Sequence, residues 1–160
     1  MPIRRATALD VEAWADLRAL LWPDTTLAQH RQDAMEMLDE PENHCAVFLD
    51  SDTKTGIRAF AEATLRHDHV HGCNTSPVAF LEGIYVRPEA RGIGIGRRLL
   101  DAIETWARKH GCTEFASDAD LTNPDGHAFH EALGFDETDR VICFHKSLRS
   151  DKSASVEAKP

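Results

Sequence analysis

Apolar side chains recur every three to four residues along much of the chain, and this spacing predicts amphipathic helices. Four segments have it: residues 11–21, 27–38, 95–110 and 124–133. Pro23 ends the first of them, because proline cannot continue a helix. Gly111 and Gly134 follow the last two, at the position where a helix end favours glycine.

Shorter segments between these helices are apolar, β-branched or alternating, which is typical of strands. They cover residues 3–5, 45–49, 58–66, 78–86, 113–117 and 139–146. Strands interleaved with helices predict an α/β or α+β fold, in which helices cover a central sheet. We expect one domain over residues 1–149 and a polar, disordered tail over residues 150–160.

The composition fits a single globular domain. The chain has 160 residues, 42% of them apolar, and no apolar run approaches the roughly 20 residues that span a membrane. No hydrophobic export signal is visible either, so we expect a cytoplasmic protein with no membrane partner. In a reducing compartment the four widely spaced cysteines are expected to be small buried apolar residues: Cys45, Cys73, Cys112 and Cys143.

The charge balance restricts the partners. Lysines and arginines number 18 against 27 acids, which gives a formal net charge of -9. Nucleic acid is therefore not expected as a partner, because its phosphates would be repelled. A cationic ligand is electrostatically favoured, although the same charge also promotes solubility.

The most informative motif lies within residues 86–100. A β-prone segment leads into Arg91-Gly92-Ile93-Gly94-Ile95-Gly96, where helical spacing begins. Glycines let the backbone approach a ligand closely, and the free N–H groups of a helix N-terminus attract a pyrophosphate. The alternating glycines do not match the dinucleotide-binding fingerprint, and no Gly-Lys-Ser/Thr follows as in a P-loop. A helix-entry turn without a ligand is the alternative interpretation.

This motif resembles the acyl-CoA pyrophosphate loop of the GNAT N-acetyltransferase superfamily. The resemblance runs in order from Leu81 to Phe135, through the strand that contains Gly83 and the helix that begins at Asn123-Pro124. It implies the GNAT acyl-CoA N-acyltransferase fold, a mixed central sheet with flanking helices that splays at a β-bulge. It also implies acetyl-CoA as cosubstrate. Gly83 is the expected site of the bulge, because glycine weakens a regular strand.

The resemblance also implies which residues hold the cofactor. Backbone groups just after Gly83 are expected to pair with the pantetheine amides, and the glycine loop is expected to bind the pyrophosphate. The implied set is Ile84, Tyr85, Val86, Arg91, Gly92, Ile93, Gly94, Ile95, Gly96 and Asn123. Asn123 is equally well explained as a helix N-cap, and Arg91 as an exposed side chain.

Other blocks, over roughly residues 3–144, resemble the aminoglycoside 6′-N-acetyltransferases within that superfamily. They include Leu20-Leu21-Trp22-Pro23, Arg66-His67-Asp68 and Ala116-Ser117-Asp118. The resemblance implies transfer of the acetyl group of acetyl-CoA to the 6′-amine of aminoglycoside antibiotics, which confers resistance. Such acceptors carry several ammonium groups, and carboxylates bind these with charge-assisted hydrogen bonds.

The implied acceptor contacts are Trp22, His69, Glu82, Asp118 and Asp139. Three of them have structural alternatives: Trp22 packing against the core, Glu82 forming an ion pair, and Asp139 lying in a solvated turn. Asp118 is expected at the carboxyl end of a strand, where ligand sites gather in open sheets.

His69 departs from the pattern of the resembling enzymes. They commonly have tyrosine at this position, where it contacts the drug across a dimer interface, so the resemblance implies a homodimer with one altered contact. His67, His69 and His71 alternate in a polar loop. We interpret them as solvated and expect no metal, because no carboxylate or cysteine spacing completes a site.

The expected reaction is direct attack of a neutral 6′-amine on the thioester in a ternary complex. A backbone N–H near Ile84 would polarise the thioester oxygen, and Glu82 or Asp118, directly or through water, is the candidate catalytic base. His130 is a candidate acid for the thiolate, although CoA thiolate can also leave unassisted. No Ser–His–Asp or Cys–His pattern supports a covalent acetyl-enzyme.

Two other functions agree with the sequence. One is acetylation of a different amine, such as a polyamine or a protein N-terminus, by a GNAT enzyme. The other is a non-catalytic sensor or interaction module that binds acyl-CoA. The glycine loop together with an acidic acceptor side favours an enzyme over a sensor.

Overall fold

A five-stranded mixed sheet forms the centre of the structure, a computed structural model that describes residues 3–150. Its strands follow chain order: β1 (Ile3–Arg5), β2 (Cys45–Asp52), β3 (Gly56–Arg66), β4 (Val78–Val86) and β5 (Phe115–Ser117). Neighbouring strands are antiparallel except β4 and β5, which are parallel. A parallel pair needs a crossover connection, and α3 (Ile95–Lys109) provides it.

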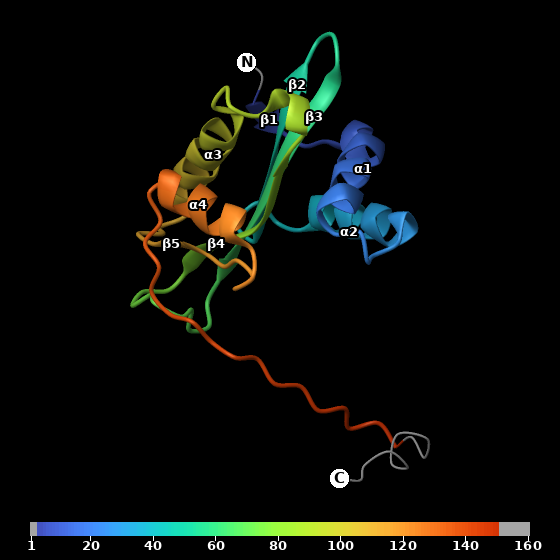
Figure 1. The fold of residues 1–160 in the computed structure, drawn as a ribbon. Helices are drawn as coiled ribbons and strands as arrows, with labels where there is room; N and C mark the ends of the chain where they lie inside the picture. The colour runs from blue at the N-terminus through green and yellow to red at the C-terminus, as the bar shows by residue number, and fades with distance from the viewer. Residues whose placement is uncertain (1–2, 151–160) are drawn as a thin grey trace.

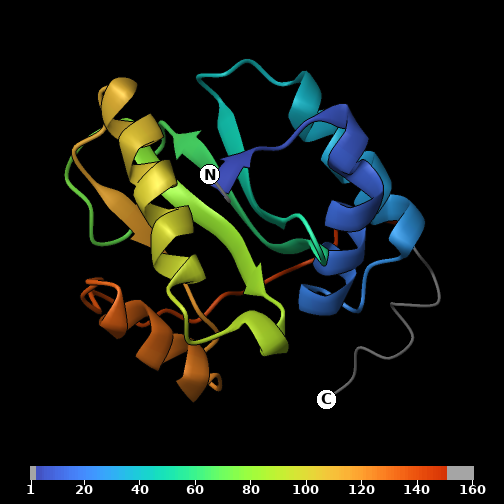
Figure 2. The ribbon, with the colours of Figure 1, turned by 90° about the horizontal axis from the view of Figure 1, so that it is seen from above.

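Helices cover both faces of the sheet (Figures 1 and 2). α1 (Val11–Leu21) and α2 (Leu27–Asp39) lie on one face, and α3 and α4 (Pro124–Ala132) lie on the other. Two short 3-10 helices, η1 (Ala8–Asp10) and η2 (Pro88–Ala90), precede α1 and α3. The predicted helix-covered sheet is confirmed, and the four predicted helices differ from the observed ones only at their ends.

Apolar side chains fill the space between the sheet and each helix layer. On one side, Leu99 and Ile103 of α3 pack with a row of β3 alanines that includes Ala61. Small side chains on the strand allow the helix to lie close to the sheet. On the other side, Trp14 of α1 packs with Phe60. The sheet is therefore held rigidly from both faces, which fixes the strands that form the site.

β4 is interrupted by a β-bulge, as predicted. Glu62 on β3 faces Gly83 and Ala63 faces Leu81, so Glu82 is the extra residue. The pairing of β4 with β5 ends at Leu81 and Ser117, although β4 continues to Val86. The two strands therefore separate directly after the bulge.

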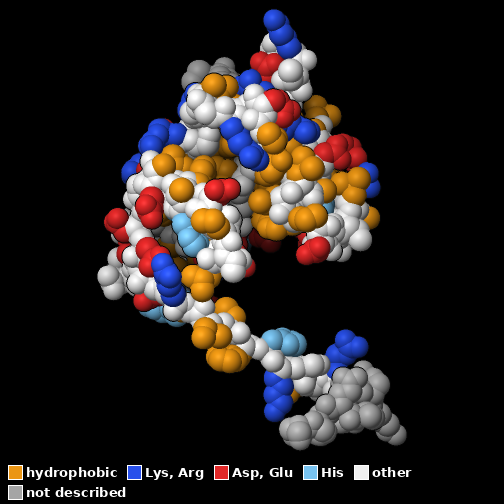
Figure 3. Space-filling model, viewed as in Figure 1, with side chains coloured by type: hydrophobic (Ala, Val, Ile, Leu, Met, Phe, Trp, Pro, Cys, Tyr) orange, Lys and Arg blue, Asp and Glu red, His pale blue; other side chains and the backbone are white. Residues whose placement is uncertain are grey.

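The predicted strand over residues 139–146 is wrong. Up to residue 150 no strand follows α4, and residues 139–150 run away from the body as an extended C-terminal arm (Figure 1). Apolar side chains lie exposed along it (Figure 3), and Ile142 and Phe144 are 81% and 92% exposed. A β-prone segment becomes a strand only beside a partner strand, and no strand of the described residues pairs with the arm. Of the predicted disordered tail, residues 151–160 lie outside the described residues.

The prediction of buried cysteines is right for two of the four. Cys45 and Cys112 are buried, Cys73 is partly exposed, and Cys143 is exposed on the C-terminal arm. All four are free thiols, and burial raises the pKa of Cys45 and Cys112. Between residues 3 and 150, none of the helices combines the length and the apolar character that a membrane crossing requires.

Candidate active site

The glycine-rich motif forms the turn that connects β4 to α3. Gly92 and Gly94 have φ angles of +82° and +87°, which glycine adopts without strain. The first backbone hydrogen bond of the helix runs from Arg98 N–H to the Gly94 carbonyl, at 3.1 Å. Within the described chain, the N–H groups of residues 92–97 have no such partner. These free donors at a helix N-terminus fit a pyrophosphate.

Two other loop residues have structural roles of their own. At Gly96 a Cβ would lie 3.2 Å from the Phe129 ring, so this glycine allows α3 and α4 to lie close together. The Arg91 side chain donates to the Val86 carbonyl at 2.7 Å and lies over the Tyr85 ring. It is therefore tied to the end of β4, and it is also exposed, as the alternative interpretation expected.

Residues 84–86 lie past the bulge, where β4 has no β5 beside it. They pair with β3 on one side, and their other edge has no strand partner among the described residues. An unpaired strand edge offers backbone donors and acceptors to an extended ligand, as the amides of a pantetheine arm require. Asn123 caps α4 by accepting a hydrogen bond from Gly126 N–H at 3.1 Å, so its N-cap role is observed. A contact between Asn123 and the cofactor stays a prediction.

An open cavity of about 250 Å³ lies beside the bulge, on the side of α1 and α2. Its walls are Arg18, Trp22, Thr25, His30, Asp33, Glu62 and Glu82. The Trp22 ring occupies the space that a Cβ on Gly83 would take, which explains the glycine at this position. Of the predicted acceptor residues, the structure brings Trp22 and Glu82 together here.

Glu82 combines the two roles considered for it. Its carboxylate accepts a hydrogen bond from Thr64 Oγ1 at 2.6 Å and pairs with Arg66 through both oxygens. The ion pair is therefore real, but the Glu82 side chain is still 30% exposed and lines the cavity. It remains accessible to a cationic acceptor.

A buried polar network beneath the cavity was not predicted from the sequence. Glu62 Oε2 accepts hydrogen bonds from Trp14 Nε1, at 2.8 Å, and from Arg18 Nη1. Arg18 Nε donates to His30 Nδ1, and His30 Nε2 donates to the Trp22 carbonyl at 2.9 Å. Burial raises the pKa of Glu62, while the positive charge of Arg18 opposes that shift. The only sequence signal was that Arg18 and Glu62 each stand between two apolar residues.

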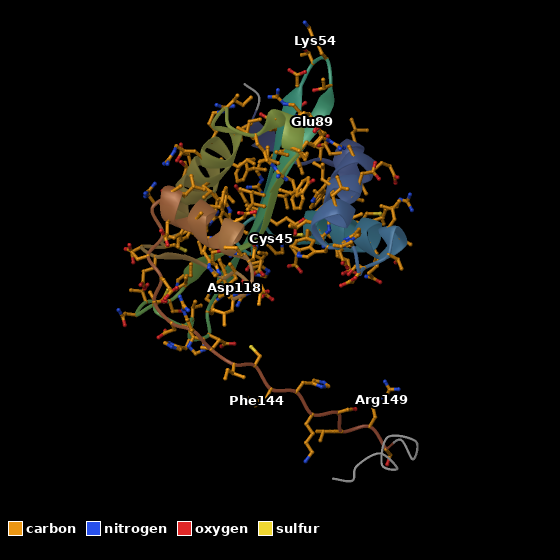
Figure 4. All side chains as sticks on the ribbon, viewed as in Figure 1. Cys45, Lys54, Glu89, Asp118, Phe144 and Arg149 are labelled. Carbon is orange, nitrogen blue, oxygen red and sulfur yellow. The ribbon has the colours of Figure 1, made fainter. Side chains whose placement is uncertain are left out.

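The remaining predicted acceptor residues lie outside this cavity. Asp118 follows β5 and is exposed (Figure 4), and Asp139 is exposed at the start of the C-terminal arm. His69 lies in the exposed loop after β3, with its ring centroid 6.0 Å from that of His71. Across residues 3–150, no group of three or more His, Cys, Asp or Glu side chains is arranged to hold a metal ion.

A hydroxyl–imidazole pair lies where β4 and β5 separate. His130 Nδ1 is 2.6 Å from the Gly126 carbonyl and therefore carries the proton, because a carbonyl only accepts. His130 Nε2 then accepts from Ser117 Oγ at 2.7 Å. Ser117 is the last β5 residue paired with β4, so the pair lies at the point from which the free edge of β4 continues.

The free edge of β4 suits a pantetheine arm, and the N-terminus of α3, which follows it in the chain, suits a pyrophosphate. Together they form the arrangement of an acyl-CoA-dependent transferase. Residues 14–135 match the model of the acetyltransferase (GNAT) family, and the chain belongs to that family.

Relatives within the family share one name. The aminoglycoside N(6′)-acetyltransferase type 1 of Serratia marcescens is 44% identical over 139 residues, which cover 87% of this chain and 94% of the relative. The protein of that name from Acinetobacter genomosp. 13 is 46% identical over 148 residues, 92% of this chain and 97% of the relative.

Solved structures agree with this relationship. AAC(6′)-Iy in complex with the bisubstrate analogue CoA-S-monomethyl-acetylneamine has a TM-score of 0.84 at 40% identity, covering 91% of this chain and 97% of that one. The aminoglycoside 6′-N-acetyltransferase AAC(6′)-Ih from Acinetobacter baumannii has a TM-score of 0.86 at 42% identity, covering 92% of this chain and 98% of that one.

Proposed function

We propose that this protein is an aminoglycoside 6′-N-acetyltransferase, which acetylates the 6′-amine of aminoglycoside antibiotics with acetyl-CoA and thereby confers resistance. The main support is that both halves of this reaction meet at one bulge. The free edge of β4 after Gly83 suits an acyl thioester, and the acid-lined cavity beside Glu82 suits a polycation. The names of the relatives support the same acceptor. Acetyl-CoA supply favours a cytoplasmic location.

The proposed reaction is a single transfer in a ternary complex. The neutral amine nitrogen bonds to the acetyl carbon, whose oxygen is polarised by a backbone N–H near Ile84, and the C–S bond breaks. Glu82 or Asp118 takes the proton from the amine, directly or through water. His130 Nε2, which accepts from Ser117 in the structure, would first take up a proton from solvent and then return it to the thiolate through the Ser117 hydroxyl, so CoA leaves as a free thiol.

Release of CoA thiol tests this function directly. Purified protein with acetyl-CoA and kanamycin A is expected to release thiol and to yield a product acetylated at the 6′-nitrogen, as identified by NMR. Paromomycin is the matched acceptor, because it has a hydroxyl group in place of the 6′-amine, and it should give no turnover. Turnover with spermidine or a peptide N-terminus alone would indicate a different GNAT substrate. Binding of acetyl-CoA without any turnover would indicate a sensor.

We also propose that the active form is a homodimer whose second copy covers the C-terminal arm. The arm exposes Val141, Ile142 and Phe144, and side chains of this kind are rarely left in water as a contiguous group. β5 is the last strand of the sheet and has an unpaired outer edge in the described chain, which a strand from a second copy can extend. The acceptor sites are proposed to lie near this interface, with His69 reaching the other subunit's acceptor groove.

Light scattering tests the dimer. The wild-type protein is expected at twice the monomer mass, and Phe144→Asp should shift it toward monomer, because a buried charge opposes association. A monomeric wild type at full activity would contradict the arrangement. His69→Tyr should change the KM for the aminoglycoside and leave the KM for acetyl-CoA unchanged if His69 contacts the acceptor.

A further inference from the structure

Glu62 is a buried carboxylate, and burying a carboxylate lowers stability unless polar partners compensate for its lost hydration. It lies on β3 directly opposite Gly83 and is only 2% exposed. Both of its hydrogen bonds, from Trp14 and Arg18, go to the same oxygen, Oε2. Oε1 has no hydrogen-bond partner among the described residues, although the side chain lines the cavity. A buried carboxylate with one oxygen left free toward a cavity is arranged to accept a donor from outside the protein.

The charges around this cavity do not balance. Three carboxylates line it, those of Asp33, Glu62 and Glu82. Two guanidinium groups are paired with them: Arg66 with Glu82, and Arg18 with Glu62 and, at 3.5 Å, with Asp33. One negative charge is left over, so the cavity favours an additional cation.

The cavity also has the walls that an alkylammonium group requires. The Trp22 indole, with the Arg18 guanidinium over its ring, lines the cavity at the bulge, and Thr25 contributes a hydroxyl group. The Asp33 side chain is 34% exposed, so an incoming group can reach it without unfolding α2. Arg18 forms an ion pair with Glu62, and its positive charge opposes the larger effect of burial, which raises the Glu62 pKa.

We propose that Asp33 and Glu62 form a second ammonium subsite, which binds a non-reacting ammonium group of the acceptor in the cavity that Trp22 also lines. This inference rests on the proposed aminoglycoside acetylation and specifies how the acceptor is held. The reacting amine must lose its proton to attack, whereas the other amines of the acceptor stay protonated and need their own carboxylates. Asp33 and Glu62 are therefore specificity-determining residues, and Glu82 and Asp118 remain the candidates for the reacting amine.

Helix α2 provides a matched control for Asp33. Gln29 donates to Asp33 at 2.8 Å, and Gln32 donates to Glu36 at 2.9 Å, each from four residues earlier. Only Asp33 lines the cavity. Asp33→Asn and Glu36→Gln thus remove the same charge from equivalent helix pairs, one inside the proposed subsite and one outside it.

The test compares two acceptors that share the 6-amino sugar. Neamine carries further amines, and methyl 6-amino-6-deoxyglucoside carries only the reacting one. Asp33→Asn is expected to raise the KM for neamine about tenfold, the effect of losing one charge-assisted hydrogen bond. It should leave the KM for the monoamine and for acetyl-CoA unchanged. Glu36→Gln should leave all three constants unchanged.

Glu62→Gln should likewise raise the KM for neamine and leave the KM for the monoamine unchanged. Since this change also weakens a buried ion pair, thermal unfolding establishes whether the variant is folded, and Asp33→Asn provides the test if it is not. An unchanged KM of Asp33→Asn for neamine would overturn the subsite, and so would an equal rise for both acceptors. Failure of the wild-type protein to acetylate neamine would instead overturn the proposed function.

Discussion

Replacing Gly83 by alanine should lower stability through a single steric contact. Gly83 does not have a positive φ angle, so alanine is compatible with its backbone. In a strand, alanine is in fact favoured over glycine by up to about 1 kcal/mol. The added Cβ, however, would overlap the Trp22 ring and lie 3.2 Å from Leu21 Cδ2. The expected loss therefore comes from displacing the indole.

Overpacking of this kind costs about 1–3 kcal/mol, which the small gain in strand propensity only partly offsets. A net loss of about 2 kcal/mol corresponds to a fall in Tm of about 4–8 °C for a chain of this size. The displaced Trp22 ring would also no longer form its part of the cavity wall. We therefore expect Gly83→Ala to raise the KM for the acceptor as well as to lower the free energy of unfolding.

A double-mutant cycle with Trp22→Ala separates these effects. With the indole removed, Gly83→Ala should become neutral or slightly stabilising, because the Cβ then has room. Urea unfolding followed by far-UV circular dichroism measures all four proteins without depending on tryptophan fluorescence. If the stability losses of the two single variants add up to the loss of the double variant within about 0.5 kcal/mol, the steric explanation is refuted. A Gly83→Ala variant as stable as the wild type would refute it too.

Three further outcomes are expected. Gly94→Ala should weaken acetyl-CoA binding in calorimetry, whereas Gly111→Ala, which has a similar φ of +86° away from the loop, should cost comparable strain and leave binding unchanged. His130→Gln should lower kcat about tenfold or more without changing the KM for acetyl-CoA, and His127→Gln on the same helix should have no effect. The hydrogen bond from Arg4 lowers the pKa of Asp10 from 3.8 to about 2, so Asp10→Asn should lose about 2 kcal/mol of stability at pH 7. Because the folded pKa is the lower one, this difference should disappear as the pH falls from about 4 to 2.

The sequence predicted the fold well where the pattern of apolar residues is local. The helix over residues 95–110 shows its apolar face directly in its spacing. The bulge at Gly83 was predicted from the resemblance to the GNAT superfamily, and glycine weakens a regular strand at that position. The strand prediction for residues 139–146 was wrong for a different reason. Its composition is typical of a strand, but a strand also needs a partner, and residue spacing says nothing about whether the same chain provides one.

The buried network could not be predicted because its members are far apart in the sequence. Glu62 lies in a segment of small apolar residues, where an acid is ordinarily taken as solvent-facing. Its partner Arg18 comes from α1, so burial of either charge depends on a contact that only the packed fold creates. Ser117 and His130 come together in the same way, through the packing of α4 against the end of β5.

The main chain forms most of the proposed cofactor side, whereas side chains form the acceptor side. The N–H groups of residues 92–97 and the edge of residues 84–86 are present whatever side chains stand there, as long as the glycines remain. Single codon changes at Asp33 or His69, by contrast, would alter the surface that we propose an antibiotic contacts. Under drug selection such an enzyme can therefore change its resistance spectrum in small steps while its use of acetyl-CoA is preserved.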